Sequence, residues 1–349
     1  MKILFIVPYP SEGPSNRFRV EQYLPELSRR GIEYSLRPFC GTVFYRILLK
    51  KGRLLKKIIY AAISTISRMT DLVRAPKYDI VFIHREAFPH DDFVFELLFR
   101  LLAKRLIYDF DDAIFLKKPG KVKYITRVSD RVITGNAFLA EYAGRMNRNV
   151  VTIPTCIDTE KYRPSVPHGG ENKIVIGWIG TPTTSVYIKS IADALRSISE
   201  KFPSVEIRII GGSLKNSDGV PGVLKDWTLD DELRELQGFD IGIMPMPDDD
   251  WTKGKCAFKL IQYMSVGIPS VASPVGMNRS VIEDGVSGFF ASTSSEWVEK
   301  LSTLIGSAEL RKSMGDNARR AVEERFSLKK NSTLFIDTLE RISSDKPKR

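Results

Sequence analysis

The 349-residue sequence is poor in the residues that bind metals or cross-link a chain, with 3 cysteines and 3 histidines. Cys40, Cys156 and Cys256 form no Cys-x-x-Cys pair. An odd number of isolated cysteines favours reduced thiols in the cytosol over a disulfide framework. No histidine is spaced from another histidine or a cysteine as zinc ligands are, so we expect no metal site.

Long apolar runs are also absent. No segment reaches the ~18 uninterrupted apolar residues that a membrane-spanning helix needs. The apolar run after Met1 ends at Pro8 without a small-residue cleavage site, which favours a buried strand over a signal peptide. No Gly-x-Gly-x-x-Gly follows this strand, which makes an NAD-linked dehydrogenase a weak alternative.

Strand-like and helix-like segments alternate along the chain. Apolar runs that predict strands occupy 1–8, 79–84, 105–110, 131–134, 150–154, 173–180, 205–211, 240–245 and 270–273. Alternating strands and helices predict doubly wound parallel sheets. The length predicts two domains, and the prolines and glycines of 158–172 mark the expected linker.

The net charge of +11 is unevenly distributed. Residues 1–150 hold 27 Lys/Arg against 15 Asp/Glu, whereas residues 151–349 hold 26 against 27. Nucleic acid, an anionic membrane surface or a phosphate-linked acceptor would each suit a basic amino half. No RNA-binding or helix-turn-helix signature is present, so we favour the membrane or the acceptor and expect no nucleic-acid partner.

Residues 43–74 combine bulky apolar residues with clustered Lys/Arg, and 43–60 contain no acid. This composition suits an amphipathic helix on anionic lipid, broken in two at Gly52. The alternative is a helix that packs on the amino-domain sheet and turns a basic face outward.

Residues 248–269 read as polar loop and short helix between two strands, one βαβ unit. Gly254, two lysines and a helix amino end suit a phosphate beyond the carboxyl ends of the strands. Lys255 and Lys259 lie four apart and are expected to share one helix face. A solvated, lysine-bearing helix is the alternative.

Within this stretch, residues 259–272 (Lys-Leu-Ile-Gln-Tyr-Met-Ser-Val-Gly-Ile-Pro-Ser-Val-Ala) resemble the signature of retaining glycosyltransferases of the GT-B fold, family 4. The resemblance implies an α/β protein with two Rossmann-like domains facing a cleft. An acceptor domain would span 1–165 and a nucleotide-sugar domain 170–326. A C-terminal helix at about 327–345 would return to the amino domain, before a frayed tail.

Two positions depart from the family pattern, which has two glutamates at this site. The first corresponds to Gly254, which cannot replace a carboxylate, and Asp248, Asp249 or Asp250 would have to contact the sugar instead. The second corresponds to Gln262, whose amide is still able to hydrogen-bond a ribose hydroxyl.

The resemblance implies further donor contacts in both domains. Gly13 and Arg17 belong to the loop and helix after the first strand, where Arg17 is either a cleft contact or a surface charge. Trp227 is either an edge for the nucleobase or a core residue. The remaining candidates are Gly180, Thr181, Thr183, Lys255, Cys256, Ala257, Lys259 and Gln262.

Three carboxylates end the strand at 105–110: Asp109, Asp111 and Asp112. Like charges this close are costly unless they meet a cation, a sugar hydroxyl or one another through a shared proton. We expect Asp109 and Asp111 to contact acceptor or sugar, while Asp112 alternatively caps the next helix. His84, at another strand end, is a second catalytic candidate or a structural histidine.

The resulting expectation is a cytoplasmic, metal-independent enzyme that transfers a sugar from a UDP- or GDP-linked donor, with retention. It would stabilise the departing diphosphate by positive charge and N–H groups, with no further cofactor. The acceptor would be a lipid-linked glycan or polysaccharide, and the protein would lie peripherally on the inner membrane face. The alternative is a GT-B-like protein that binds a nucleotide sugar or anionic saccharide without turnover.

Overall fold

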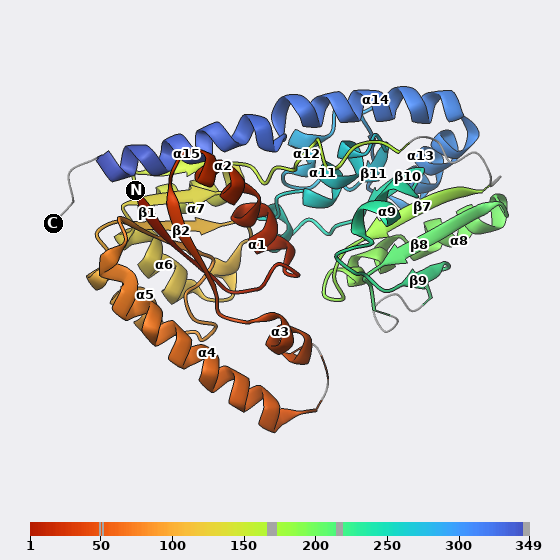
Figure 1. The fold of residues 1–349 in the computed structure, drawn as a ribbon. Helices are drawn as coiled ribbons and strands as arrows, with labels where there is room; N and C mark the ends of the chain where they lie inside the picture. The colour runs from red at the N-terminus through yellow and green to blue at the C-terminus, as the bar shows by residue number, and fades with distance from the viewer. Residues whose placement is uncertain (49, 51, 166–172, 214–218, 345–349) are drawn as a thin grey trace. The chain divides into compact units, whose positions relative to one another are not determined.

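The computed structural model describes residues 1–48, 50, 52–165, 173–213 and 219–344 (Figure 1). The chain divides into two compact units. Unit 1 comprises Met1–Cys156, Gly254–Cys256 and Leu328–Arg349, and unit 2 comprises Ile157–Lys253 and Ala257–Ser327. Among the described residues each unit contains one six-stranded parallel sheet, as the alternating sequence pattern predicts.

The sheet of unit 1 has the strand order β2-β1-β3-β4-β5-β6. Its strands are β1 (Lys2–Val7), β2 (Glu33–Pro38), β3 (Ile80–His84), β4 (Leu106–Phe110), β5 (Arg131–Thr134) and β6 (Val150–Thr152). The chain places β2 on one side of β1 and then continues with β3 on the other side. Ligands of such sheets bind at this reversal, beyond the carboxyl ends of the two strands.

Helices cover the sheet of unit 1 on both faces (Figure 1). They are α1 (Pro14–Arg19), α2 (Leu24–Arg29), α3 (Thr42–Leu48), α4 (Leu54–Arg74), α5 (Val94–Leu102), α6 (Pro119–Val128), α7 (Ala137–Gly144) and α15 (Leu328–Ser344). As the sequence predicts, α15 returns to this unit, where Phe335 stacks on Tyr23 at 4.1 Å between ring centroids. Of the expected tail, residues 345–349 lie outside the described residues.

Gly52 separates α3 from α4, as its place in the sequence predicts, and it has a positive φ of 73°. Glycine adopts this left-handed conformation without the steric cost that a Cβ imposes. Arg53 beside it also has a positive φ, of 56°. Two consecutive left-handed residues cannot continue a right-handed helix, so α4 starts anew at Leu54.

The sheet of unit 2 has the strand order β12-β11-β10-β7-β8-β9. Its strands are β7 (Ile174–Ile179), β8 (Val205–Ile210), β9 (Val223–Lys225), β10 (Ile241–Met244), β11 (Ser270–Ala272) and β12 (Phe289–Phe290). The chain runs from β7 out to β9, then crosses to the other side of β7 with β10. The reversal point of this unit therefore lies between the ends of β7 and β10.

The helices of unit 2 pack around a core that contains Trp178 and Trp297. They are α8 (Ala192–Lys201), α9 (Glu232–Gln237), α10 (Asp250–Lys253), α11 (Phe258–Ser265), α12 (Asn278–Val281), α13 (Ser294–Gly306) and α14 (Ala308–Arg325). Residues 158–165 of the expected linker belong to this unit, and 166–172 lie outside the described residues. Over the described chain, no helix is both long enough and apolar enough to span a bilayer.

Candidate functional site

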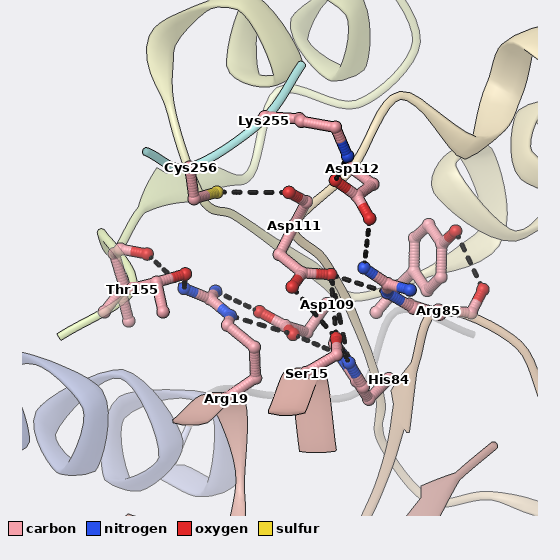
Figure 2. A network of polar contacts seen from close by, with 12 residues as sticks. Ser15, Arg19, His84, Arg85, Asp109, Asp111, Asp112, Thr155, Lys255 and Cys256 are labelled. Carbon is pink, nitrogen blue, oxygen red and sulfur yellow. Dashed lines mark hydrogen bonds and ion pairs between the residues drawn. The ribbon is translucent and has the colours of Figure 1, made fainter. Parts of the chain in front are cut away.

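A serine and a histidine meet at the reversal point of unit 1 (Figure 2). Ser15 lies in α1, which follows β1, and His84 is the last residue of β3. The Ser15 Oγ and His84 Nε2 atoms are 2.6 Å apart. Since β1 and β3 are the two strands at which the chain reverses, this contact marks the position where a ligand is expected.

Asp109 contacts the ring nitrogen of His84 that does not face Ser15. The two residues pair in register on β3 and β4, and His84 Nδ1 lies 2.6 Å from Asp109 Oδ2. Arg19 forms an ion pair with the same carboxylate and donates to the carbonyl oxygen of Ile153 at 2.6 Å. Burial alone would raise the pKa of Asp109, but the Arg19 charge and the His84 hydrogen bond outweigh it and lower that pKa.

Asp111 stands on the other side of the serine. Its carboxylate accepts a hydrogen bond from Ser15 Oγ at 2.9 Å and one from Arg85 Nε at 2.6 Å. Burial opposes ionisation, yet the charges of Arg85 and His84 hold the pKa of Asp111 well below its usual range. Asp111 is therefore an ionised acceptor of hydrogen bonds near neutral pH, and it is buried, with 9% of its surface exposed.

Arg85 links two of the three carboxylates, since it also forms an ion pair with Asp112. Its backbone has a positive φ of 61°, a conformation that costs energy in a residue other than glycine. The Arg85 N–H donates to the Asp109 carbonyl at 2.7 Å, and its carbonyl accepts from Tyr108 Oη at 3.1 Å. These bonds hold the strained residue in place.

Residues Gly254–Cys256 join this network although the sequence around them belongs to unit 2. Asn136 Nδ2 donates to the carbonyl oxygens of Gly254 and Lys255, at 2.9 and 3.1 Å. The Cys256 thiol donates to the Asp111 carbonyl at 3.1 Å, and burial raises the pKa of that thiol to about 12. Cys256 is thus a buried structural thiol.

The expectation that Lys255 and Lys259 share one helix face is wrong. Ala257 has a positive φ of 52°, and α11 begins only at Phe258. Lys255 therefore lies before the helix, in unit 1, where its Nζ is 3.4 Å from Asp112 Oδ1. The Asp112 side chain thus pairs with Arg85 and Lys255. Its backbone carbonyl oxygen accepts a hydrogen bond from the Ile114 N–H at 2.7 Å.

Lys259 and Gly180 lie together in unit 2, at the end of β7. A Cβ placed on Gly180 would lie 2.8 Å from Lys259 Cε and 2.5 Å from the Trp178 ring. Lys259 Nζ lies 5.3 Å from the centroid of the Trp178 ring, within the range of a cation–π contact. A side chain at position 180 would thus force the Trp178 ring and the end of the Lys259 side chain to shift, at the reversal point of the sheet.

The loop after Gly180 carries the predicted hydroxyl groups. Thr181 Oγ1 and Thr183 Oγ1 are 2.9 Å apart, and the Thr181 N–H donates to Thr184 Oγ1 at 3.3 Å. The loop leads into a 3₁₀ helix, Ser185–Ile191, before α8. A ligand that takes hydrogen bonds from this loop would replace contacts that the threonines make with one another.

Two further donor candidates occupy different surroundings in unit 2. Gln262 lies within α11 and is buried, with 5% of its surface exposed. Trp227 is half-buried after β9, and its indole N–H donates to Glu232 Oε2 at 3.0 Å. Trp227 is therefore outside the group of fully buried side chains that form the core.

The candidates before and in α1 differ in what they contact. Gly13 is the N-cap residue, and a Cβ there would lie 2.6 Å from Tyr9 Cβ. Arg17 is half-buried, with its guanidinium 4.6 Å from the centroid of the Phe18 ring. Arg19, two residues further on, forms the ion pair with Asp109.

Sequence reasoning did not select Ser15, Arg85 or Asn136 as site residues. Arg85 directly follows His84 at the end of a predicted strand, and Ser15 lies in the predicted loop at Gly13. Their positions beside His84 and Gly13 were the signal available in the sequence, because side chains that follow adjacent parallel strands meet at one edge of the sheet. Nothing local to Asn136 indicates its bonds to residues more than a hundred positions away.

Comparisons with known proteins report on the fold and on the family. The model of the family described as "Glycosyl transferases group 1" matches residues 173–307, which belong to unit 2 except for Gly254–Cys256 of unit 1. No curated protein matches the chain in sequence.

Solved structures extend the likeness to the whole chain. HepE from Anabaena, in complex with UDP and glucose, has a TM-score of 0.73 at 15% identity and covers 97% of this chain and 99% of its own. Sucrose-phosphate synthase from Thermosynechococcus elongatus has a TM-score of 0.73 at 11% identity, and the match covers 98% of this chain and 99% of the synthase chain. A glycosyltransferase from Rickettsia africae has a TM-score of 0.72 at 14% identity, and the match covers 99% of both chains. The chain thus has the GT-B fold, with two Rossmann-like domains.

Proposed function

We propose that this protein is a glycosyltransferase that moves a sugar from a nucleotide-sugar donor to an acceptor, with retention at the anomeric carbon. The observation that carries the proposal is the position of Lys259 at the reversal point of unit 2, where a Cβ on Gly180 would lie only 2.8 Å from Lys259 Cε. It lies inside the segment that matches the group 1 glycosyl transferase family. Retention rests on the resemblance of residues 259–272 to the family signature.

In this proposal unit 2 binds the donor diphosphate. The Lys259 ammonium and the N–H groups of the loop at Thr181 would stabilise the negative charge that develops as the sugar leaves. Such stabilisation requires neither a covalent intermediate nor a metal ion. The HepE complexes contain UDP or UDP-glucose, and this favours UDP over GDP as the donor nucleotide here.

Unit 1 would bind hydroxyl groups of the sugar or acceptor through Asp111. This carboxylate has a lowered pKa and keeps 9% of its surface exposed, and it would accept a hydrogen bond from a sugar hydroxyl. Asp109 and His84 are fully buried. They therefore act as positioning residues: His84 contacts Ser15, and Asp109 holds His84 and Arg19.

The acceptor that we propose is a lipid-linked glycan or a polysaccharide. The basic amino half of the chain suits an acceptor that carries phosphate, since its positive field attracts anions. We place the enzyme in the cytoplasm, at the inner face of a membrane. Three buried cysteines without a disulfide suit that reducing compartment.

A thermal-shift titration with UDP, GDP, ADP and dTDP, with and without magnesium, tests the donor site. We expect one nucleotide to raise the melting temperature without magnesium, and Lys259→Ala to remove that shift. Lys173→Ala, at an exposed position of the same unit, is the control and should retain it. No shift with any nucleotide, or an equal loss in both variants, would contradict the donor site.

Turnover separates the enzyme from its alternative. A protein that binds a nucleotide sugar without catalysis is favoured by one observation, the glycine at position 254 in place of a carboxylate. Incubation with labelled donor and analysis of released nucleotide decides between the two. Release in wild type, and its loss in Asp111→Asn, would support transfer. Binding without release would establish the alternative.

A further inference from the structure

Helix α4 of unit 1 turns apolar side chains toward solvent. Leu55 is 71% exposed, Ile66 63% and Val73 78%. They belong to a row of exposed residues that recur every three or four positions, Leu55, Ile59, Ala62, Ile66, Met69 and Val73. At about 100° of rotation per residue this spacing places the row along one side of the helix.

The opposite side of α4 is the one that packs on the protein, and it is largely polar. Its buried residues are Ser64, Arg68, Asp71 and Leu72. Arg68 donates to the carbonyl oxygens of Val7 and Arg37, at 3.2 and 3.1 Å, and forms an ion pair with Asp71. This is the reverse of an ordinary surface helix, whose apolar side faces the core.

The exposed apolar surface continues onto α5, which contacts α4. In Figure 1 both helices lie at the edge of unit 1, on the side away from α15. Exposed apolar residues on or beside α5 are Phe93, Val94, Leu98, Leu101 and Leu102. An apolar surface spread over two neighbouring helices indicates a site of contact with a partner or a membrane.

One end of this surface is strongly basic. A groove of about 510 Å³ between α3 and α4 is lined by Arg46, Lys50, Arg53 and Lys56 together with Val43, Ile47, Ile59, Tyr60 and Ile63. Residues 43–77 contain nine Lys/Arg and one acid, Asp71. That acid is buried and paired with Arg37 and Arg68, so it does not offset the exposed positive charge.

We propose that the exposed face of α4 and α5 docks on an anionic lipid bilayer. The apolar row would enter the boundary between headgroups and acyl chains, and the lysines and arginines of the groove would bind lipid phosphates. This proposal deepens the membrane location given above and rests on unit 1 alone. Its readout requires no donor, acceptor or turnover.

Charge favours a bilayer over a second copy of the chain. A twofold dimer places the same patch of both subunits in contact, so the interface would carry the positive charge of two basic grooves. Like charges at an interface are unfavourable. An anionic bilayer offers complementary charge and an apolar interior to the same face.

Flotation of the full chain with lipid vesicles tests the proposal. We expect binding to vesicles of phosphatidylcholine with phosphatidylglycerol, weak binding to phosphatidylcholine alone, and loss of binding at high salt. Arg53→Glu with Lys56→Glu should weaken binding more than tenfold, because each basic residue near an anionic surface contributes about a fivefold effect. Ile59→Asp with Ile66→Asp should also abolish it, since it places charge in the apolar row.

Matched variants on unit 2 are the controls. Lys312→Glu with Arg320→Glu changes charge equally on α14, and Val286→Asp changes an exposed apolar residue. Both should bind vesicles as wild type does. Equal loss in control and α4 variants, or no binding to anionic vesicles, would overturn the proposal. A dimer in light scattering that Ile66→Asp dissociates would assign the face to a second copy and also overturn it.

Discussion

Gly254 lies directly against Ala113, so closely that a Cβ at position 254 would be 2.7 Å from the Ala113 backbone nitrogen and 2.5 Å from its Cβ. Both residues belong to unit 1. Position 254, which the resemblance aligns with a glutamate of the family, thus has no space for a side chain in this structure.

Gly254→Ala should therefore destabilise the protein, by about 1–3 kcal/mol, because an overpacked side chain forces its neighbours to shift. Urea unfolding monitored by circular dichroism measures the change. Gly120→Ala in α6 is the matched control, since a Cβ there meets no atom within 4 Å. It should be neutral or slightly stabilising. Equal effects at both glycines would contradict the close approach to Ala113.

Asp109→Asn should destabilise the protein by about 3–5 kcal/mol, because it leaves the buried Arg19 without its ionic partner. The substitution keeps the shape of the side chain, so lost packing does not explain the effect. Glu141→Gln removes one member of an exposed ion pair with Arg145 and should cost at most about 0.5 kcal/mol. Denaturant unfolding of both variants gives the comparison.

Acid should weaken unit 1 through Asp109 and Asp111, whose pKa values are lowered by folding. A lowered pKa contributes stability that is present above the pKa of the unfolded chain, about 3.9, and is lost as pH falls through the folded value. We expect the melting temperature to decrease once the pH is lower than about 4. Asp109→Asn should make this decline shallower, and an unchanged slope would show that the carboxylate is not linked to folding.

Gly180→Ala should weaken nucleoside diphosphate binding about tenfold or more. The added methyl group displaces Lys259 and the Trp178 ring, and a misplaced ammonium loses a charge-assisted bond of about 1.5–3 kcal/mol. Isothermal titration with UDP measures the affinity. Gly306→Ala, where a Cβ meets nothing within 4 Å, should bind as wild type does. Retained affinity in Gly180→Ala would separate Lys259 from the diphosphate.

The parts of the fold that local sequence determines were predicted well. Apolar runs bounded by Pro, Gly or Asp gave β1, β5 and β7 within a residue or two, and helical spacing gave α14 at 308–325. The short or edge strands β2, β9 and β12 were missed or seen only as a strand entry. In β2 the first residue is exposed and the other five are half-buried, so it lacks a run of buried apolar residues, and its pairing with β1 decides its conformation.

The candidate site was predicted where one strand end supplies several groups and missed where distant segments meet. His84, Asp109 and Asp111 lie at or directly after the ends of predicted strands, and the structure brings them together. The partners that neutralise the carboxylates, Arg19 and Arg85, are set by tertiary contacts that no local pattern reports. The error at Lys255 has the same origin, because bonds from Asn136 hold the residues before α11 out of the helix.

The return of α15 to unit 1 has a consequence for the order in which the chain folds during synthesis. All six strands of unit 1 are made before residue 153, but Phe335, Ile336 and Leu339 of α15 fill the core of that unit. These residues leave the ribosome only after the whole of unit 2. Until then part of the apolar face of the first-made sheet stays uncovered, whereas unit 2 already has its full sequence. A released chain that ends at Ser327 should accordingly protect unit 2 from protease and leave unit 1 open to cleavage.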